Sequence, residues 1–238
     1  MNVQGKVVLI TGASAGIGLA TAKRFAQEGA KVALVARSAD ALARLADELS
    51  KQGREAIAIP VDLRDPAEVK RAIAETARHY GRLDILINNA GQAAAGTVAD
   101  LNPEDFRQIL DLNVFAPLLA MQAAIPVMRE QGGGLIINVS SMVSKMRIPG
   151  LAAYAATKVA LNMLSDTARV ELASENIRVI SIFPRMTATD FAKNSLGDPE
   201  VRRRQRVNPA APTDTPEHVA ERILAAAINE PEEQYMED

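Results

Sequence analysis

The chain has 238 residues, with 27 basic and 29 acidic side chains, two histidines and no cysteine. Its length suits a single α/β domain with a sizeable core, because no linker rich in Pro, Gly or Ser divides it. The net charge of −2 argues against nucleic acid as a principal partner, and the missing cysteines exclude disulfides and thiolate metal sites.

We expect neither a metal site nor a membrane span. The two histidines, His79 and His218, lie far from each other in the sequence and lack suitably spaced carboxylates. No uninterrupted apolar stretch reaches the length that crosses a bilayer. The first predicted strand begins almost at the N-terminus, which leaves no room for a signal peptide. We therefore expect a cytoplasmic protein that needs no metal ion.

The N-terminal segment predicts a strand, a glycine-rich turn, a helix and a second strand. An apolar run at 7–10 precedes Gly12, Gly16 and Gly18, and a second apolar run covers 32–35. A βαβ unit of about thirty residues is the setting of a dinucleotide site, where glycines let the backbone approach a pyrophosphate. The spacing is Gly-x3-Gly-x-Gly instead of the commoner Gly-x-Gly-x-x-Gly. A plain tight turn is the alternative, but it gives no reason for three glycines.

The end of the second strand indicates which nicotinamide cofactor is preferred. An NAD site is expected to place Asp or Glu here, on the ribose 2′-hydroxyl. The sequence instead has Ala36 followed by Arg37, so a guanidinium is available to pair with a 2′-phosphate. This favours NADP(H) over NAD(H). The alternative interpretation is a surface arginine that begins a loop.

Further elements alternate along the chain. Apolar runs predict strands at 56–61, 83–87, 135–139 and 179–183, each separated from the next by a helical pattern. Capping residues followed by proline begin helices at Asp65-Pro66, Asn102-Pro103 and Thr215-Pro216. Continuously apolar strands that alternate with helices predict a doubly wound parallel sheet, the Rossmann fold, in one domain over 1–238.

A proton-transfer site is indicated in the second half of the chain. Tyr154 and Lys158 are four residues apart in the run YAATK, and Ser141 lies thirteen residues before the tyrosine. On a helix this spacing puts the ammonium on the same face as the phenol, where it favours the ionised form of the phenol. The serine hydroxyl could hold a substrate oxygen against that phenol. The alternative is a packed ring beside a solvated amine.

These motifs together resemble the classical short-chain dehydrogenase/reductase family over nearly the whole chain. TGASAGIG is similar to its cofactor loop, VDL at 61–63 to its adenine contact and NNAG at 88–91 to the turn after the fourth strand. Asn113 matches the helix asparagine, and Ser141, Tyr154 and Lys158 match the catalytic motif. Singly, Asp62 could end a strand, NNAG could be a turn, and Asn113 could face a backbone carbonyl.

The resemblance implies specific roles for these residues. Tyr154 exchanges the proton, Ser141 positions the substrate oxygen, and Lys158 holds the nicotinamide ribose and lowers the tyrosine pKa. Asn113 supports a water that leads from Lys158 to solvent. The predicted cofactor contacts are Gly12, Ser14, Gly16, Ile17, Gly18, Arg37, Asp62, Leu63, Asn89, Ala90, Gly91, Tyr154, Lys158, Pro184, Thr187 and Thr189.

One position departs from the family pattern. The family generally has Pro-Gly after the sixth strand, whereas Pro184 is followed here by Arg185, with Thr189 at the expected place. We expect Arg185 to point toward the substrate mouth and the segment at about 186–212 to act as a substrate lid.

Two classes of substrate stay open. Lys145, Arg147, Arg185 and the basic run at 202–206 favour an anionic substrate, unless they are ordinary solvated charges. An apolar pocket is the alternative, with Met142, Met146, Leu151 and Phe191 as its candidate residues.

The helices at 106–128 and 159–172 are apolar on more than one face, although a helix on a sheet needs one buried stripe. The family commonly dimerises through these helices, so we expect a homodimer or homotetramer. The predicted function is an NADP(H)-dependent oxidoreductase that interconverts a small-molecule carbonyl and a secondary alcohol. A catalytically silent NADP(H)-binding regulator with the same fold is the alternative.

Overall fold

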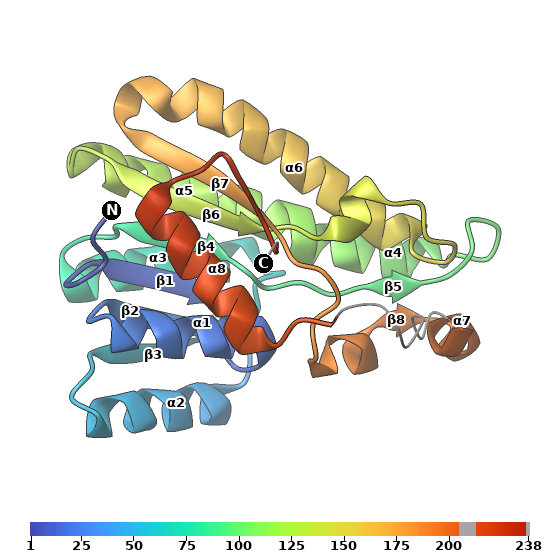
Figure 1. The fold of residues 1–238 in the computed structure, drawn as a ribbon, viewed down its shortest axis with the longest axis horizontal. Coiled ribbons are helices and arrows are strands. Elements are labelled where there is room, and N and C mark those ends of the chain that lie inside the picture. Colours follow the sequence, from blue (N-terminus) through green and yellow to red (C-terminus); the bar gives the residue numbers. More distant parts are fainter. Residues whose placement is uncertain (205–212, 237–238) are drawn as a thin grey trace.

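The structure, a computed structural model, describes residues 1–204 and 213–236 and is built on a seven-stranded parallel sheet (Figure 1). The strand order is β3-β2-β1-β4-β6-β7-β9. Between β1 and β4 the order reverses, which is the topological switch point of a doubly wound sheet. The strands are β1 Val7–Thr11, β2 Lys31–Ala36, β3 Ala56–Pro60, β4 Ile85–Asn88, β6 Gly134–Val139, β7 Ile177–Phe183 and β9 Glu233–Tyr235. The predicted doubly wound fold is confirmed.

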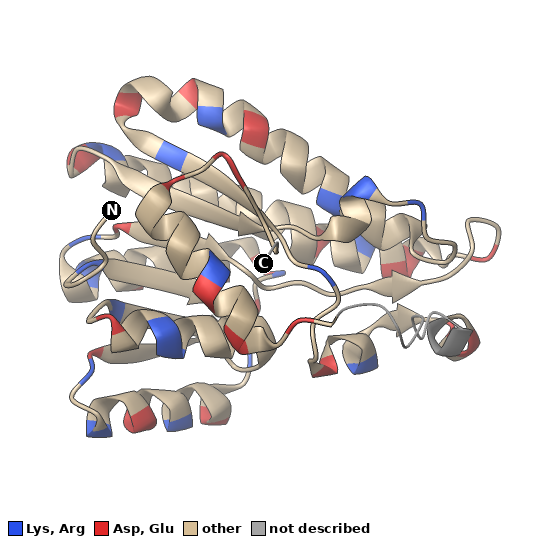
Figure 2. Cartoon of the chain, viewed as in Figure 1, with Lys and Arg blue, Asp and Glu red and all other residues tan. Residues whose placement is uncertain are grey.

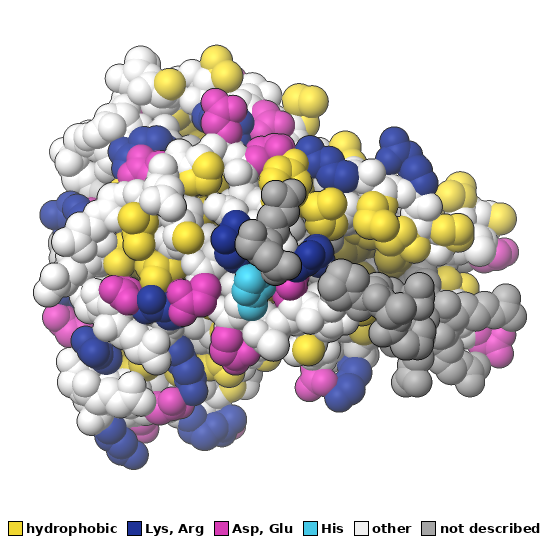
Figure 3. Space-filling model, viewed as in Figure 1, with side chains coloured by type: hydrophobic (Ala, Val, Ile, Leu, Met, Phe, Trp, Pro, Cys, Tyr) yellow, Lys and Arg dark blue, Asp and Glu magenta, His cyan; other side chains and the backbone are white. Residues whose placement is uncertain are grey.

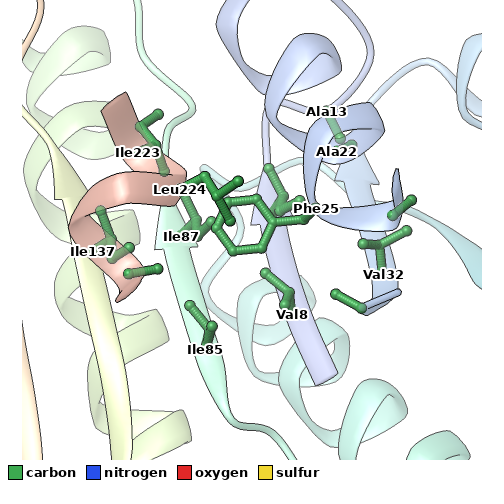
Figure 4. Packing of buried hydrophobic residues seen from close by; sticks show 14 of the residues in the cluster. Val8, Ala13, Ala22, Phe25, Val32, Ile85, Ile87, Ile137, Ile223 and Leu224 are labelled. Carbon is green, nitrogen blue, oxygen red and sulfur yellow. The ribbon is translucent and has the colours of Figure 1, made fainter. Parts of the chain in front are cut away.

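Helices cover both faces of the sheet (Figure 1). One face carries α1 Gly16–Gln27, α2 Ala39–Lys51 and α8 Pro216–Asn229, and the other carries α3 Pro66–Tyr80, α5 Ala116–Glu130 and α6 Ala152–Leu172. In Figure 4, Phe25 of α1 lies next to Leu224 of α8, with Val8 and Ile87 of the central strands close to its ring. Because both faces are covered, the strands are apolar at nearly every position.

Local sequence signals place the helix starts. The side chains of Asp65, Asn102 and Thr215 each accept a hydrogen bond from a backbone N–H in the first turn of the helix that follows. A proline follows each cap, at a position whose N–H has no helical partner. All three predicted starts are confirmed. Charged residues fall mainly on the helices and in the loops, and few fall on the central strands (Figure 2).

The long apolar helix contains a local distortion. It consists of α4 Pro103–Leu110, a π-helical turn at Asp111–Phe115 and then α5. By length and composition, Pro103–Glu130 is apolar enough to cross a membrane, which differs from the expectation from sequence. This is weak evidence for a span, because a core helix passes the same test and α5 buries Ala120, Ala124 and Met128 against the sheet.

Short elements build the edge around the site. A parallel pair joins β5 Ala94–Ala95 to β8 Leu196–Gly197, far apart in sequence. Single 3-10 turns cover η2 Met142–Lys145, η3 Ala173–Glu175 and η4 Asp190–Asn194, and α7 spans Pro199–Arg204. The pairing of β5 with β8 fixes the segment after β7 against the loop after β4.

Candidate active site

The turn between β1 and α1 has room only for glycine at key positions. Gly12 and Gly16 adopt left-handed backbone angles, with φ of 70° and 53°. A Cβ at Gly18 would lie 2.2 Å from the Gly12 carbonyl oxygen, and one at Gly12 would lie 2.9 Å from Asn89 Nδ2. The turn is therefore packed tightly against the loop after β4, with the N-terminus of α1 beside it.

Asn89 ties the ends of two central strands together. Its side chain donates to the Thr11 carbonyl at 2.8 Å, and its own N–H donates to Thr11 Oγ1 at 2.9 Å. The Ala90 N–H donates to the same hydroxyl at 3.0 Å. Asn89 thus shapes the switch point, and it is not among the residues that line the cavity described next. Thr11 was missed from sequence, although it directly precedes the glycine turn.

A cavity of about 250 Å³ opens at the carboxyl edge of the sheet, where α/β folds bind nucleotides. The glycine turn and the ends of β2, β3 and β4 line it. Of the predicted contacts, those in its wall are Gly12, Ser14, Arg37, Asp62, Leu63, Ala90 and Gly91. The other predicted contacts are not in the wall: Gly16, Ile17, Gly18, Asn89, Tyr154, Lys158, Pro184, Thr187 and Thr189. Of these, Ile17 packs on the core. A glycine cradle, a helix N-terminus and a cavity of this kind fit a dinucleotide.

Charged side chains meet at the outer part of this cavity. Arg37 and Ser38 line it at the end of β2, and Asp62 and Arg64 line it after β3. Arg64 donates to both carboxylate oxygens of Asp62, from Nε at 3.2 Å and from Nη2 at 2.9 Å. Hydrogen bonding by Arg64 lowers the pKa of Asp62, and the nearby charge of Arg37 adds to this. Arg64 and Ser38 were missed from sequence.

Three of the catalytic candidates converge from α6 and from the end of β6. Tyr154 and Lys158 lie on α6, as predicted, and the Lys158 ammonium is 5.8 Å from the centre of the tyrosine ring. Ser141 follows β6 and caps the η2 turn, and its hydroxyl lies near enough to the phenol to lower the pKa of Tyr154. A Cβ at Gly91 would lie 3.6 Å from Lys158 Nζ. Because Gly91 lines the cavity, the ammonium lies close to the nucleotide-sized space.

The expected lowering of the phenol pKa is not found. Burial raises the pKa of Tyr154 to about 12, and the hydrogen bond with Ser141 opposes this rise. Lys158 is almost fully buried, and burial lowers its pKa to about 8. Its ammonium donates to the Val139 carbonyl at 2.8 Å. The lysine therefore binds the end of β6 through a hydrogen bond. Desolvation is the largest influence on the pKa of both Tyr154 and Lys158.

Asn113 connects the loop after β4 to the catalytic helix. It is fully buried in the π-helical turn. Its Oδ1 accepts from the Gln92 N–H at 2.9 Å, and its Nδ2 donates to the Gln92 carbonyl at 2.8 Å and to Thr157 Oγ1 at 3.0 Å. Asn113 thus faces a backbone carbonyl, which is the alternative interpretation given above for this residue. Its hydrogen bond with Thr157 also holds the segment next to Lys158. π-helical turns are frequent at functional sites.

The segment after β7 departs from the expectation for Arg185. Its guanidinium pairs with both carboxylate oxygens of the buried Asp214, at 3.2 and 2.9 Å. A cation therefore compensates a buried carboxylate here. The Pro184 carbonyl accepts from the Met142 N–H at 3.0 Å, which joins this loop to the η2 turn.

The two predicted threonine contacts lie in different places. Thr189 Cγ2 would be 3.0 Å from a Cβ at Gly16, so Thr189 packs against the glycine turn. Thr187 forms a parallel bridge with Asp214. Thr189 therefore lies near the predicted cofactor loop, whereas Thr187 joins the two ends of the segment after β7.

The apolar and basic residues predicted to line the substrate entrance make different contacts. The Phe191 ring lies 5.6 Å from the Tyr154 ring, at the start of the predicted lid. Lys145 pairs with Glu233 at 3.4 Å and lies over the Phe183 ring. Residues 205–212 of that lid and Arg206 of the basic run lie outside the described residues, and Arg202 lies in α7. Figure 3 shows hydrophobic side chains gathered at the end of the molecule that holds β5.

No group of three or more His, Cys, Asp or Glu side chains suited to a metal ion occurs within residues 1–204 and 213–236.

Comparisons with known proteins show the family of this chain. Residues 6–200 match the family model described as short chain dehydrogenase. A 3alpha-hydroxysteroid dehydrogenase of Mediterraneibacter gnavus is 37% identical over 193 residues, which cover 80% of this chain and 77% of that protein.

Two solved structures are similar in fold. The 3-ketoacyl-(acyl-carrier-protein) reductase of Brucella melitensis, complexed with NADH, has a TM-score of 0.82 and 33% identity, with 95% of this chain and 91% of that chain covered. A short chain dehydrogenase/reductase of Burkholderia phymatum, in complex with NAD, has a TM-score of 0.92 at 24% identity and covers 99% of this chain and 90% of that one. The chain therefore belongs to the short-chain dehydrogenase/reductase family of oxidoreductases, which act on CH–OH groups with a nicotinamide cofactor.

Proposed function

We propose that the protein is an NADP(H)-dependent oxidoreductase that interconverts a carbonyl and a secondary alcohol, with Tyr154 as the acid and base. The observation that carries this proposal is the convergence of Ser141, Tyr154 and Lys158 beside the cavity at the switch point. The Ser141 hydroxyl lies near enough to the phenol to lower its pKa, and Lys158 neighbours Gly91 in the cavity wall.

The bound nicotinamide supplies or accepts the hydride in this chemistry. The chain itself moves the proton: in the reducing direction the Tyr154 phenol donates to the substrate oxygen, which the Ser141 hydroxyl holds by a hydrogen bond. A phenol with a pKa of about 12 is protonated at neutral pH, the state in which it can donate, although burial makes it a weaker acid than a free phenol. The Lys158 ammonium would hold the ribose next to the nicotinamide, and Asn113 fixes the loop on which Gly91 lies.

The preference for NADP(H) is supported by the cavity wall at the end of β2. Arg37 and Ser38 lie side by side there, and neither is acidic. Ser38 occupies the cap position of α2, and its hydroxyl makes no capping hydrogen bond within that helix. A guanidinium and a hydroxyl at a helix N-terminus are suitable partners for a 2′-phosphate. The two similar structures named above contain NAD or NADH, so this preference has to be tested on the protein itself.

An uncharged, largely apolar substrate is better supported than an anionic one. Two of the basic candidates, Lys145 and Arg185, pair with carboxylates. Phe191 packs against the catalytic ring, and its side chain is 38% exposed. A ring in this position offers apolar contact next to the reacting oxygen.

NADPH consumption in the presence of a panel of ketones and aldehydes tests the function. We expect oxidation of NADPH with apolar ketones, and a rate with NADH that is lower by about tenfold or more, as the loss of a charge-assisted contact implies. NADPH binding without turnover on any carbonyl or alcohol would instead support the silent regulator.

We also propose that the protein forms a homodimer or homotetramer. Apolar side chains on α6 and the π-helical turn stay exposed, with Met163 at 66%, Val170 at 79% and Phe115 at 51%. Such side chains on two neighbouring helices suit an interface with a second copy.

A further inference from the structure

Asp62 and Arg64 form a clamp at the edge of the cavity. The guanidinium holds both carboxylate oxygens, with Nε 3.2 Å from Oδ1 and Nη2 2.9 Å from Oδ2. The backbone N–H of Arg64 also donates to Oδ1, at 3.1 Å. Three donors from one residue therefore fix the rotation of the Asp62 carboxylate, and both side chains line the cavity.

This pair matters little for stability. The two side chains are 42% and 32% exposed, and an exposed ion pair contributes little to the free energy of unfolding. Its consequence is orientation: a bidentate guanidinium is a planar fork that admits one arrangement of the carboxylate. The clamp therefore affects what the cavity can bind more than how firmly the chain folds.

The surrounding charges keep Asp62 an acceptor. Arg64 and then Arg37 lower its pKa, so the carboxylate is ionised at neutral pH. Asp111 lies near enough to Arg64 to stabilise the guanidinium charge. An ionised carboxylate has no hydrogen to donate. Toward the cavity, Asp62 therefore presents lone pairs alone.

We propose that Arg64 is a positioning residue that sets the Asp62 carboxylate as a fixed acceptor for the amino group of adenine, so that the cavity rejects a base with a carbonyl at that place. The inference rests on the proposed dinucleotide function of the cavity. Adenine offers an N–H donor to this carboxylate. Hypoxanthine presents an oxygen instead, which would leave two acceptors face to face and both unpaired.

Calorimetry with two dinucleotides tests this role without any turnover. The ligands are NADP⁺ and nicotinamide hypoxanthine dinucleotide phosphate, which carry the same charge, so that long-range effects of removing Arg64 cancel in the ratio of their Kd values. We expect the unmodified protein to prefer adenine by roughly tenfold or more, as one hydrogen bond to a charged group implies. Arg64→Ala should reduce this preference at least threefold.

Two further variants separate orientation from charge. Arg64→Lys keeps the charge and loses the fork, so its preference should fall nearly as far as that of Arg64→Ala. In an Asp62→Asn background, Arg64→Ala should leave the preference unchanged, because the carboxylate on which it acts is gone. Arg37→Ala is the matched control: it should weaken both ligands alike and keep their ratio.

The outcomes are distinguishable. Unchanged adenine preference in both Arg64 variants, with circular dichroism showing that they are folded, overturns the inference and leaves the proposed function intact. An equal effect of Arg64→Ala with and without Asp62 also overturns it. If the unmodified protein binds neither dinucleotide, the proposed function fails, and the inference fails with it.

Discussion

The Lys158 ammonium donates to the Val139 carbonyl at 2.8 Å while it lies 5.8 Å from the centre of the Tyr154 ring. The carbonyl belongs to the last residue of β6, so the catalytic helix is joined to the sheet edge by a buried charge. At this distance the cation does not offset the burial of the phenol, whose pKa rises to about 12. The phenol is therefore protonated at neutral pH.

Replacing Tyr154 with Phe removes the proposed proton donor and little else. The ring and its contact with Phe191 remain, so the cavity keeps its shape. We expect kcat/KM for carbonyl reduction to fall by about 100-fold or more, the usual contribution of a general acid. The Kd of NADPH, measured by calorimetry, should change less than about threefold, far short of one charge-assisted hydrogen bond. A variant that retains most of its turnover would refute the assignment.

The buried Lys158 should make stability depend on pH in alkaline solution. Its pKa is about 8 in the fold and ordinarily 10.5, so between these values the unfolded chain binds more protons. Burial of the charged Lys158 lowers the free energy of unfolding. This loss disappears as pH rises through this range. Below pH 8 the penalty is largest, on the order of 3 kcal/mol.

Lys158→Met isolates this effect, because all other groups titrate alike in both proteins. The variant should unfold at higher urea concentration at pH 7, and its advantage should shrink by about 2–3 kcal/mol by pH 10. Urea unfolding at four pH values measures the difference. An advantage that stays constant with pH would show that Lys158 does not titrate in this range.

The sequence predicts what depends on neighbours along the chain. The apolar strands, the capped helix starts at Asp65 and Asn102, and the four-residue spacing of Tyr154 and Lys158 are all local patterns, and the structure has them. Strand β9 is different, because Glu-Gln-Tyr is not an apolar run. Only its pairing with β7 makes it a strand.

Contacts between distant residues could not be predicted in this way. Asn89 matches a family motif, yet its partner Thr11 lies 78 residues away. Arg185 stands where glycine is usual, and its partner Asp214 is 29 residues further on. Arg64 is the intermediate case, since its partner is two residues away but an arginine after a strand has many possible roles. Each assignment requires knowing which segments the fold brings together.

The preference for NADP(H) should reverse in Arg37→Asp. The new carboxylate would repel a 2′-phosphate and could accept from the 2′-hydroxyl of NADH. We expect the ratio of the Kd of NADPH to that of NADH to rise by about 100-fold, which corresponds to roughly 3 kcal/mol. Direct titration with each reduced cofactor gives both constants. Unchanged selectivity between NADPH and NADH would show that Arg37 does not bind the 2′-phosphate.

Arg185 and Asp214 should be energetically coupled. Asp214 is 7% exposed, so the loss of its cation leaves a buried carboxylate poorly compensated. We expect Arg185→Ala to lower the free energy of unfolding by about 1–3 kcal/mol. The double variant Arg185→Ala/Asp214→Asn should cost less than the sum of the two single changes, by about 1 kcal/mol. If the two single changes in the free energy of unfolding add strictly in the double variant, this ion pair does not hold the segment after β7 in place.

The exposed apolar side chains of α6 give a test of the oligomer. Met163 is 66% exposed, and Val159 on the same helix is 49% exposed. A glutamate at Met163 would place a charge in the centre of an interface that buries this helix, which favours separate chains. Light scattering of Met163→Glu should therefore give a lower mass than that of the unmodified protein.

Val98→Glu is the matched control, since Val98 is 81% exposed in the loop after β5 and its change should leave the mass unaltered. An unmodified protein that is already monomeric would exclude the interface. A Met163→Glu variant that keeps the mass of the oligomer would place the interface elsewhere.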